Sequence, residues 1–178
     1  NNNDIEKANE FLRKKGLAKA SKKSSREANE GAVGCYTNND TVAILKINSE
    51  TDFAAKSETF LNFLDELGNF AVQMNNHNIS IDQFLELDFK GAKINDYFKT
   101  MIAKIGENLI LSNLLVLNVK NSSFSYYVHN SYKKHIGKIL SLIIYESDKS
   151  DEDSNELSKN LCMHIAAMKP ESLDIDDL

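Results

Sequence analysis

The sequence predicts an α+β domain in which an antiparallel sheet of at least three strands is covered by helices, preceded by an N-terminal helical remnant and a linker. Two patterns predict this fold class. Short apolar runs separated by polar turns are typical of strands, and longer segments with apolar residues at three- and four-residue steps are typical of helices. The chain has 178 residues, of which 42% are hydrophobic, and this is enough for one sizeable core.

The N-terminal segment is predicted to be helical from Asp4 to Arg26, with Gly16 as an interruption. Residues 17–26 are basic. The favoured interpretation is a solvated linker helix, and the alternative is a nucleic-acid patch. Stacking on bases needs aromatic side chains between the basic ones, and this stretch has none, so we favour the linker. The basic residues are Lys19, Lys22, Lys23 and Arg26.

A β-hairpin and a strand-to-helix corner follow. Residues 31–36 and 41–47 are predicted strands joined by the polar turn 38–40, and the second strand contains the apolar run 42–47. Thr51 is a good N-cap, and Asp52 would lie in the first helical turn, where the helix dipole favours a carboxylate. Phe53 therefore lies at a corner. A Phe in such a position is more often packed inside than offered to a partner.

Three helical segments are predicted next. Residues 57–74 carry apolar side chains on one broad face, residues 79–87 form a short helix opening at Ser80, and 88–91 form a loop. Residues 92–108 form another helix, and Gly106 is a natural terminator near its end.

The last third of the chain has three further apolar runs with β-branched residues, which predict strands over 109–119, 125–129 and 138–145. Residues 156–168 then form a helix that Pro170 ends. Its apolar residues, Leu157, Leu161, Ile165 and Met168, form a stripe along the helix.

Composition and motifs argue against several function classes. A formal net charge of -5 does not suit a protein whose main ligand is nucleic acid. The glycines form neither a GxxxxGK nor a GxGxxG motif, so no nucleotide or other cofactor is predicted. Glu50 and Asp52 could form a catalytic carboxylate pair, but no nucleophile accompanies them.

The cysteines, the histidines and the apolar runs predict no disulfide, no metal site and no membrane span. Cys35 and Cys162 belong to no CxxC pair, so we expect buried thiols. The four histidines lack metal-ligand spacing, so no metal site is predicted. No apolar run approaches the length that crosses a bilayer, and the first residues do not form a signal or transit peptide.

Three short motifs carry a resemblance to a known family. They are NSETDF at residues 48–53, AKIGEN at 103–108 and HIAAMKP at 164–170. In this order they resemble the signatures of elongation factor Ts, the guanine nucleotide exchange factor for elongation factor Tu. Each motif is weak alone, but three in register are specific.

The resemblance implies a function and a set of contact residues. The chain would bind elongation factor Tu in its GDP-bound and nucleotide-free forms and promote GDP release during translation elongation, without being an enzyme. Phe53 would insert near the magnesium and phosphate region of the partner, and Asp52 would add polar contacts beside it. Thr51, Ile105 and His129 match further interface positions. Ala54 stands where the family motif has Val, which we expect to remove apolar volume beside Phe53.

The resemblance also implies a domain organisation. We expect a remnant of the family's small N-terminal helical (UBA-like) domain over 1–16, a linker helix over 17–31, a core domain of the dimerisation type over 32–170 and a loose tail over 171–178. Many family members continue into a second half. The abundance of Asn and the lack of a signal favour an organelle, most simply the mitochondrion, with the bacterial cytoplasm as the alternative.

Two other functions stay open from the sequence. One is a protein-binding module with the same fold but without exchange activity, and the other is a nucleic-acid-associated domain that uses the linker lysines. Binding without faster GDP release would select the first, and steeply salt-dependent RNA binding would select the second.

Overall fold

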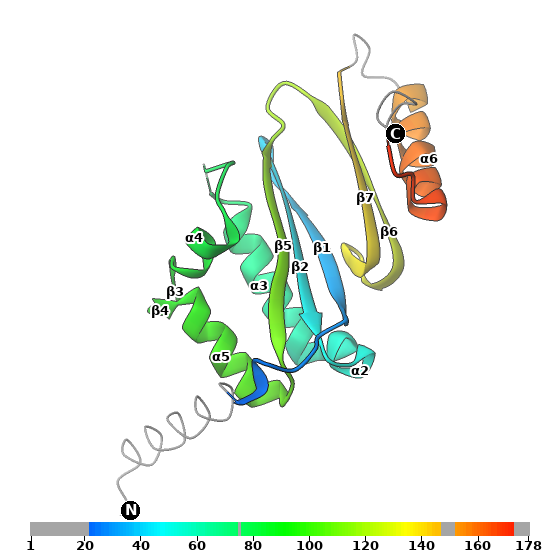
Figure 1. The fold of residues 1–178 in the computed structure, drawn as a ribbon. Helices are drawn as coiled ribbons and strands as arrows, with labels where there is room; N and C mark the ends of the chain where they lie inside the picture. The colour runs from blue at the N-terminus through cyan, green and yellow to red at the C-terminus, as the bar shows by residue number, and fades with distance from the viewer. Residues whose placement is uncertain (1–21, 75, 147–151, 173–178) are drawn as a thin grey trace, which may run out of the picture.

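The computed structural model describes residues 22–74, 76–146 and 152–172. Its centre is a five-stranded antiparallel sheet with the order β5-β2-β1-β7-β6 (Figure 1). The predicted α+β class with at least three antiparallel strands is confirmed. The strands are β1 (Glu30–Thr37), β2 (Thr41–Ser49), β5 (Leu109–Asn118), β6 (Ser123–Lys133) and β7 (Ile136–Tyr145).

The β1–β2 hairpin forms where the sequence predicts it. Asn38 closes the turn, because its side-chain Oδ1 accepts hydrogen bonds from the backbone N–H of Asp40 (3.0 Å) and of Thr41 (2.8 Å). Side chains alternate between the two faces of a strand. Both faces of this hairpin are covered by apolar side chains, so its two strands are buried almost along their whole length.

Helices cover one face of β1 and β2. Two helices follow β2, α2 (Asp52–Lys56) and α3 (Glu58–Ala71). Ser57 separates them and caps the second one by accepting from the N–H of Phe60 (3.3 Å). The main core lies between this face and the helices α3, α4 (Ile81–Leu85) and α5 (Ile94–Ile105). Its largest fully buried side chains include Phe60, Phe63, Leu64, Leu67 and Phe84.

The segment between α4 and α5 is a small hairpin, not the loop expected over 88–91. Strands β3 (Asp88–Phe89) and β4 (Ala92–Lys93) pair across Lys90 and Gly91. Both turn residues have positive φ, 53° and 81°, as the tightest hairpin turns require. The composition of residues 88–91 predicted an irregular loop, because it does not reveal that the flanking residues pair as strands.

The other face of β1 and β2 packs against the β6–β7 hairpin. Only Val33 and Gly34 of β1 pair with β7, and a second apolar cluster fills the space between the two hairpins. Both strands of the second hairpin are longer than predicted. The cluster contains Val33, Cys35, Val42, Ile44 and Val119, with Phe124, Tyr126, Leu140 and Leu142 packed against it.

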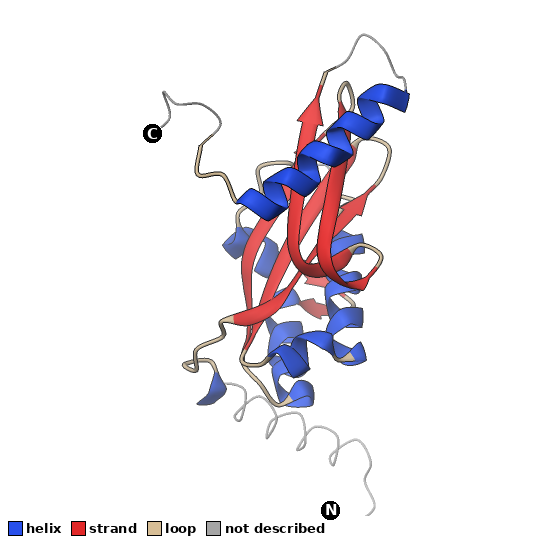
Figure 2. Cartoon of the chain, turned by 90° about the vertical axis from the view of Figure 1, so that its right-hand side faces the viewer, coloured by secondary structure: helices blue, strands red, loops and turns tan. Residues whose placement is uncertain are grey.

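Helix α6 (Glu152–Met168) lies across β6 and β7 (Figure 2), on the far side of the sheet from α3 and α5. The apolar stripe identified in the sequence is not the buried face of this helix. Leu157 and Met168 are 61% and 67% exposed, and the buried residues are Ser158, Cys162 and Ala166. Small side chains let the helix approach the hairpin closely enough for hydrogen bonds, such as Ser125 Oγ to Ser158 Oγ at 2.6 Å.

The ends of the chain are described only in part. The expected helical remnant, residues 1–16, lies outside the described residues, as does the start of the linker helix predicted over 17–31. Within the described part this helix ends at Lys23, and residues 24–29 are not helical. Of the expected tail, Glu171 and Ser172 are described and belong to no helix or strand. Among the described residues, no helix is long and apolar enough to cross a bilayer.

Candidate functional site

Phe53 projects from a short helix into solvent. Thr51 caps α2, accepting from the N–H of Ala54 at 3.2 Å, so the sequence-based N-cap is confirmed. Ala54 and Ala55 form the buried face of this helix. Phe53 lies on the opposite side and is 83% exposed. Ala54, which stands where the family motif has Val, faces inward and is 8% exposed.

Asp52 lies beside Phe53 and is also accessible. Lys56, one helical turn further on, forms an ion pair with it, with Nζ 2.7 Å from Oδ2. This hydrogen bond lowers the pKa of the Asp52 carboxyl. The Lys56 ammonium in turn lies 5.9 Å from the ring centroid of Tyr132 on β6. The exposed side of α2 thus combines a large apolar ring with an ion pair.

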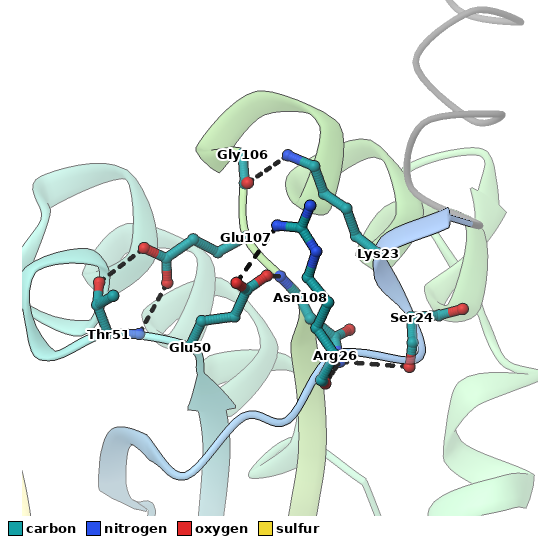
Figure 3. Close-up of polar contacts among 8 residues, drawn as sticks. All are labelled: Lys23, Ser24, Arg26, Glu50, Thr51, Gly106, Glu107 and Asn108. Atoms are coloured by element: carbon teal, nitrogen blue, oxygen red, sulfur yellow. Dashed lines mark hydrogen bonds and ion pairs between the residues drawn. The ribbon is translucent and has the colours of Figure 1, made fainter.

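Four residues hold α2 in place, and we call them the corner clamp: Glu50, Thr51, Glu107 and Asn108 (Figure 3). The Glu107 carboxylate accepts from both the N–H (2.9 Å) and the hydroxyl (2.6 Å) of Thr51. In the reverse direction, Glu50 Oε1 accepts from the N–H of Asn108 (2.7 Å). The first two motifs of the sequence, 55 positions apart at their starts (103 − 48), therefore bind each other directly.

The linker is tied to the same clamp. Asn108, which is 1% exposed, donates from Nδ2 to the carbonyl oxygens of Arg26 (2.7 Å) and Ser24 (3.4 Å). Arg26 pairs with Glu50 at 3.4 Å, and Lys23 donates to the carbonyl oxygen of Gly106. Two of the four basic residues in the predicted linker thus bind the core domain. This weakens the nucleic-acid interpretation of the linker.

Ile105 and His129 occupy different surroundings. Ile105 is the last residue of α5, half-buried against the main core and two positions before Glu107, so the clamp joins its segment to the corner. His129 is exposed on the edge strand β6, where the Tyr127 hydroxyl lies 3.3 Å from its Nδ1. The structure brings Thr51, Asp52 and Phe53 together and leaves His129 on a separate element.

Glu50, Glu107 and Asn108 have roles that were not predicted from the sequence. Glu50 was considered as one half of a catalytic carboxylate pair, whereas in the structure its carboxylate binds Asn108 and Arg26. The sequence offered one indication of these roles: both of the first two motifs contain polar residues, Glu50 in one and Glu107 and Asn108 in the other. The third motif lies on α6, on the other side of the sheet, where Ala166 is buried and His164 is exposed (Figure 1).

The cysteine thiols and the possible metal ligands form no further site among the described residues. Cys35 and Cys162 are both buried and unpaired, and burial raises the pKa of the Cys35 thiol to about 12. In the described part of the chain, no group of three or more His, Cys, Asp or Glu side chains is placed to hold a metal ion.

Comparison with known proteins gives a consistent result. Residues 50–178 match the family model described as Elongation factor TS. The chain is 38% identical over 176 residues to Elongation factor Ts of Ehrlichia canis, which covers 98% of this chain and 60% of the relative. It is 38% identical over 178 residues to that of Zymomonas mobilis, covering 99% and 57%. The chain thus spans about 60% of the length of these bacterial relatives.

Proposed function

The chain belongs to the elongation factor Ts family, and from this we propose that it is a guanine nucleotide exchange factor that binds elongation factor Tu. It would bind the GDP-bound and the nucleotide-free form, promote GDP release during translation elongation, and make or break no covalent bond. The observation that carries the proposal is Phe53, which is 83% exposed on a helix held by the corner clamp. The relatives named above are bacterial, which favours the bacterial cytoplasm over the organelle that we expected.

An exposed Phe on a fixed helix suits insertion into a partner. Exposing a large aromatic ring has no benefit for the free protein, whereas a ring on a rigid support loses little conformational entropy when it binds. The acceptors for Thr51 hold the N-terminal end of α2. In this proposal Phe53 is the inserted group, Asp52 adds polar contact beside it, and Thr51 contributes through its position at the start of the helix.

Energetics show that Phe53 needs further contacts. A nucleotide held with nanomolar affinity is bound by about 12 kcal/mol, and burying one Phe contributes about 1.5 to 3 kcal/mol. A ten-thousandfold faster release requires only about 5.5 kcal/mol of differential interaction between two conformations of the partner. We propose that remote contacts, including Ile105 and His129, provide the binding energy that holds the partner in its open conformation.

Fluorescent GDP release from elongation factor Tu, measured with and without this chain, tests the proposal. We expect the release rate to rise with the concentration of the chain and then to saturate. Binding without faster release would instead identify a non-exchanging module of the same fold. Steep salt dependence of binding to RNA would identify the nucleic-acid alternative.

A further inference from the structure

A polar cluster outside the corner joins α3 to the turn between β6 and β7. Asp65 is its centre. Its Oδ2 accepts from Lys133 Nζ at 2.5 Å, and its Oδ1 lies 2.7 Å from His135 Nε2 and accepts from the Tyr36 hydroxyl at 3.3 Å. Burial opposes ionisation here, yet Lys133 and His135 outweigh it and lower the pKa of the Asp65 carboxyl. The Asp65 carboxylate thus links α3 to β1 and to the β6–β7 hairpin.

The partners of Asp65 are themselves held by further contacts. Lys133 also donates to Asn62 Oδ1 at 2.9 Å, one turn earlier on α3. The His135 ring meets the Tyr36 ring edge to face, with centroids 5.1 Å apart. A Cβ on Gly68 would lie 2.0 Å from the Tyr36 ring, so the helix approaches Tyr36 as closely as glycine allows. The turn is therefore fixed by side chains on both of its ends.

The same turn reaches the exposed side of α2. The pairing of β6 with β7 shifts between Ser131 and Lys133, and this bulge turns Tyr132 toward the main core, where it is half-buried. The Lys56 ammonium lies 5.9 Å from the Tyr132 ring and pairs with Asp52. A continuous series of contacts thus runs from Asp65 through the β6–β7 turn to the residue next to Phe53.

We propose that Asp65 is a positioning residue that fixes the His129-bearing strand β6 relative to Phe53, so that both parts of the partner surface engage elongation factor Tu together. The inference rests on the proposed function. Asp65 need not touch the partner, since it acts through Lys133 and His135. Without its carboxylate the folded core would stay, but β6 would sample several positions relative to α2, and fewer of them would match the partner.

The test compares Asp65→Asn with Glu66→Gln. Both remove one α3 carboxylate charge at nearly constant volume, but Glu66 binds Lys90 (2.7 Å) and the Tyr97 hydroxyl, away from the turn. Hydrogen exchange of the free protein should quicken several-fold at residues 130–136 in Asp65→Asn and stay unchanged there in Glu66→Gln. Lys133→Met, which removes the opposite partner, should reproduce the first result.

GDP release then connects this change to function. In Asp65→Asn the concentration for half-maximal release should rise about fivefold with the maximal rate unchanged, and adding Asp65→Asn to His129→Ala should raise it less than twofold further. Unchanged hydrogen exchange, or an equal increase in both backgrounds, would overturn the inference while wild-type activity stays intact. An inactive wild type would instead overturn the proposed function and this inference with it.

Discussion

At the scale of single residues, Phe53 is 83% exposed at a corner where its neighbours Ala54 and Ala55 are buried. The apolar run before it and the cap at Thr51 predicted the corner, because both signals are local. They could not predict the direction of the side chain, since a helix of five residues is too short for apolar periodicity. Its direction is set by burial of Ala54 and Ala55 against the rest of the domain.

Phe53→Ala should leave the fold nearly unchanged and slow GDP release strongly. Truncating an exposed side chain changes the free energy of unfolding by about 0.5 kcal/mol or less, and the remaining surface should still bind elongation factor Tu. Phe60→Ala is the matched control, because Phe60 is fully buried one helix later and its loss should cost about 3 to 5 kcal/mol.

Thermal unfolding and fluorescent GDP release, measured on both variants, separate the two roles. A strongly destabilised Phe53→Ala with unchanged release per folded molecule would show that Phe53 is part of the core and would remove the proposed mechanism.

The two cysteines should behave as buried thiols without a bridge between them. Cys35 is 2% exposed and Cys162 is fully buried, and burial raises the pKa of both. Since the thiolate is the reactive form, alkylation of the native protein should be slow and should become fast on unfolding. A mass two hydrogens lower under non-reducing conditions would contradict this prediction.

At the scale of elements, helices α2 and α6 depend on contacts that are distant in sequence. An isolated helix as short as α2 is unstable in water, so its position depends on the corner clamp and on the burial of Ala54 and Ala55. In α6 the buried face carries small side chains, whereas most of the large apolar ones are exposed. The small face is buried because Ser158 and Cys162 meet polar groups of β6 and β7, which periodicity alone cannot reveal.

Glu107→Ala should loosen α2 and weaken exchange. The substitution leaves the Thr51 N–H and hydroxyl without their acceptors, at a cost of about 1 to 3 kcal/mol. Glu156→Ala, on the exposed surface of α6, is the control for loss of one carboxylate. Chemical denaturation should separate the two variants, and equal midpoints would show that the clamp contributes nothing to stability.

The Asp65 cluster should make stability depend on pH in the acidic range. The pKa of this carboxyl is lowered below its ordinary value of 3.8 in the folded protein, so the unfolded chain binds the proton more readily. The stabilisation is therefore fully present above the ordinary value and is lost as pH falls through the lower, folded value. The groups that face Asp65 are Lys133, His135 and Tyr36.

Denaturation midpoints between pH 7 and pH 2 should therefore fall less steeply in Asp65→Asn than in the wild type. Glu66→Gln is a weaker control in this experiment, because the pKa of Glu66 is lowered as well, by Lys90 and Tyr97 against the effect of burial. The exposed Glu156→Ala serves instead. Identical pH profiles for Asp65→Asn and the wild type would show that the cluster does not stabilise the fold.

At the scale of the whole molecule, the sheet separates two hydrophobic clusters. Alternation along β1 and β2 sends Ala43, Leu45 and Ile47 to the helices α3 and α5, and Val42 and Ile44 to the β6–β7 hairpin. The sequence predicted the individual strands and their antiparallel class. It did not predict how the second hairpin lies over the first, because only two residue pairs join β1 to β7 and no local pattern encodes them.

The size of the interface leads to the last prediction. The chain spans about 60% of the length of the Ehrlichia canis relative, and exchange needs contacts well beyond Phe53. If the additional part of the relative contributes to the interface, the 178-residue chain should bind elongation factor Tu more weakly than the relative does, while keeping its fold. The same reasoning predicts that the relative, cut to its matching segment, loses affinity to a similar extent. Titration calorimetry on the three proteins measures both differences, and equal affinities would place the whole interface within residues 32–170.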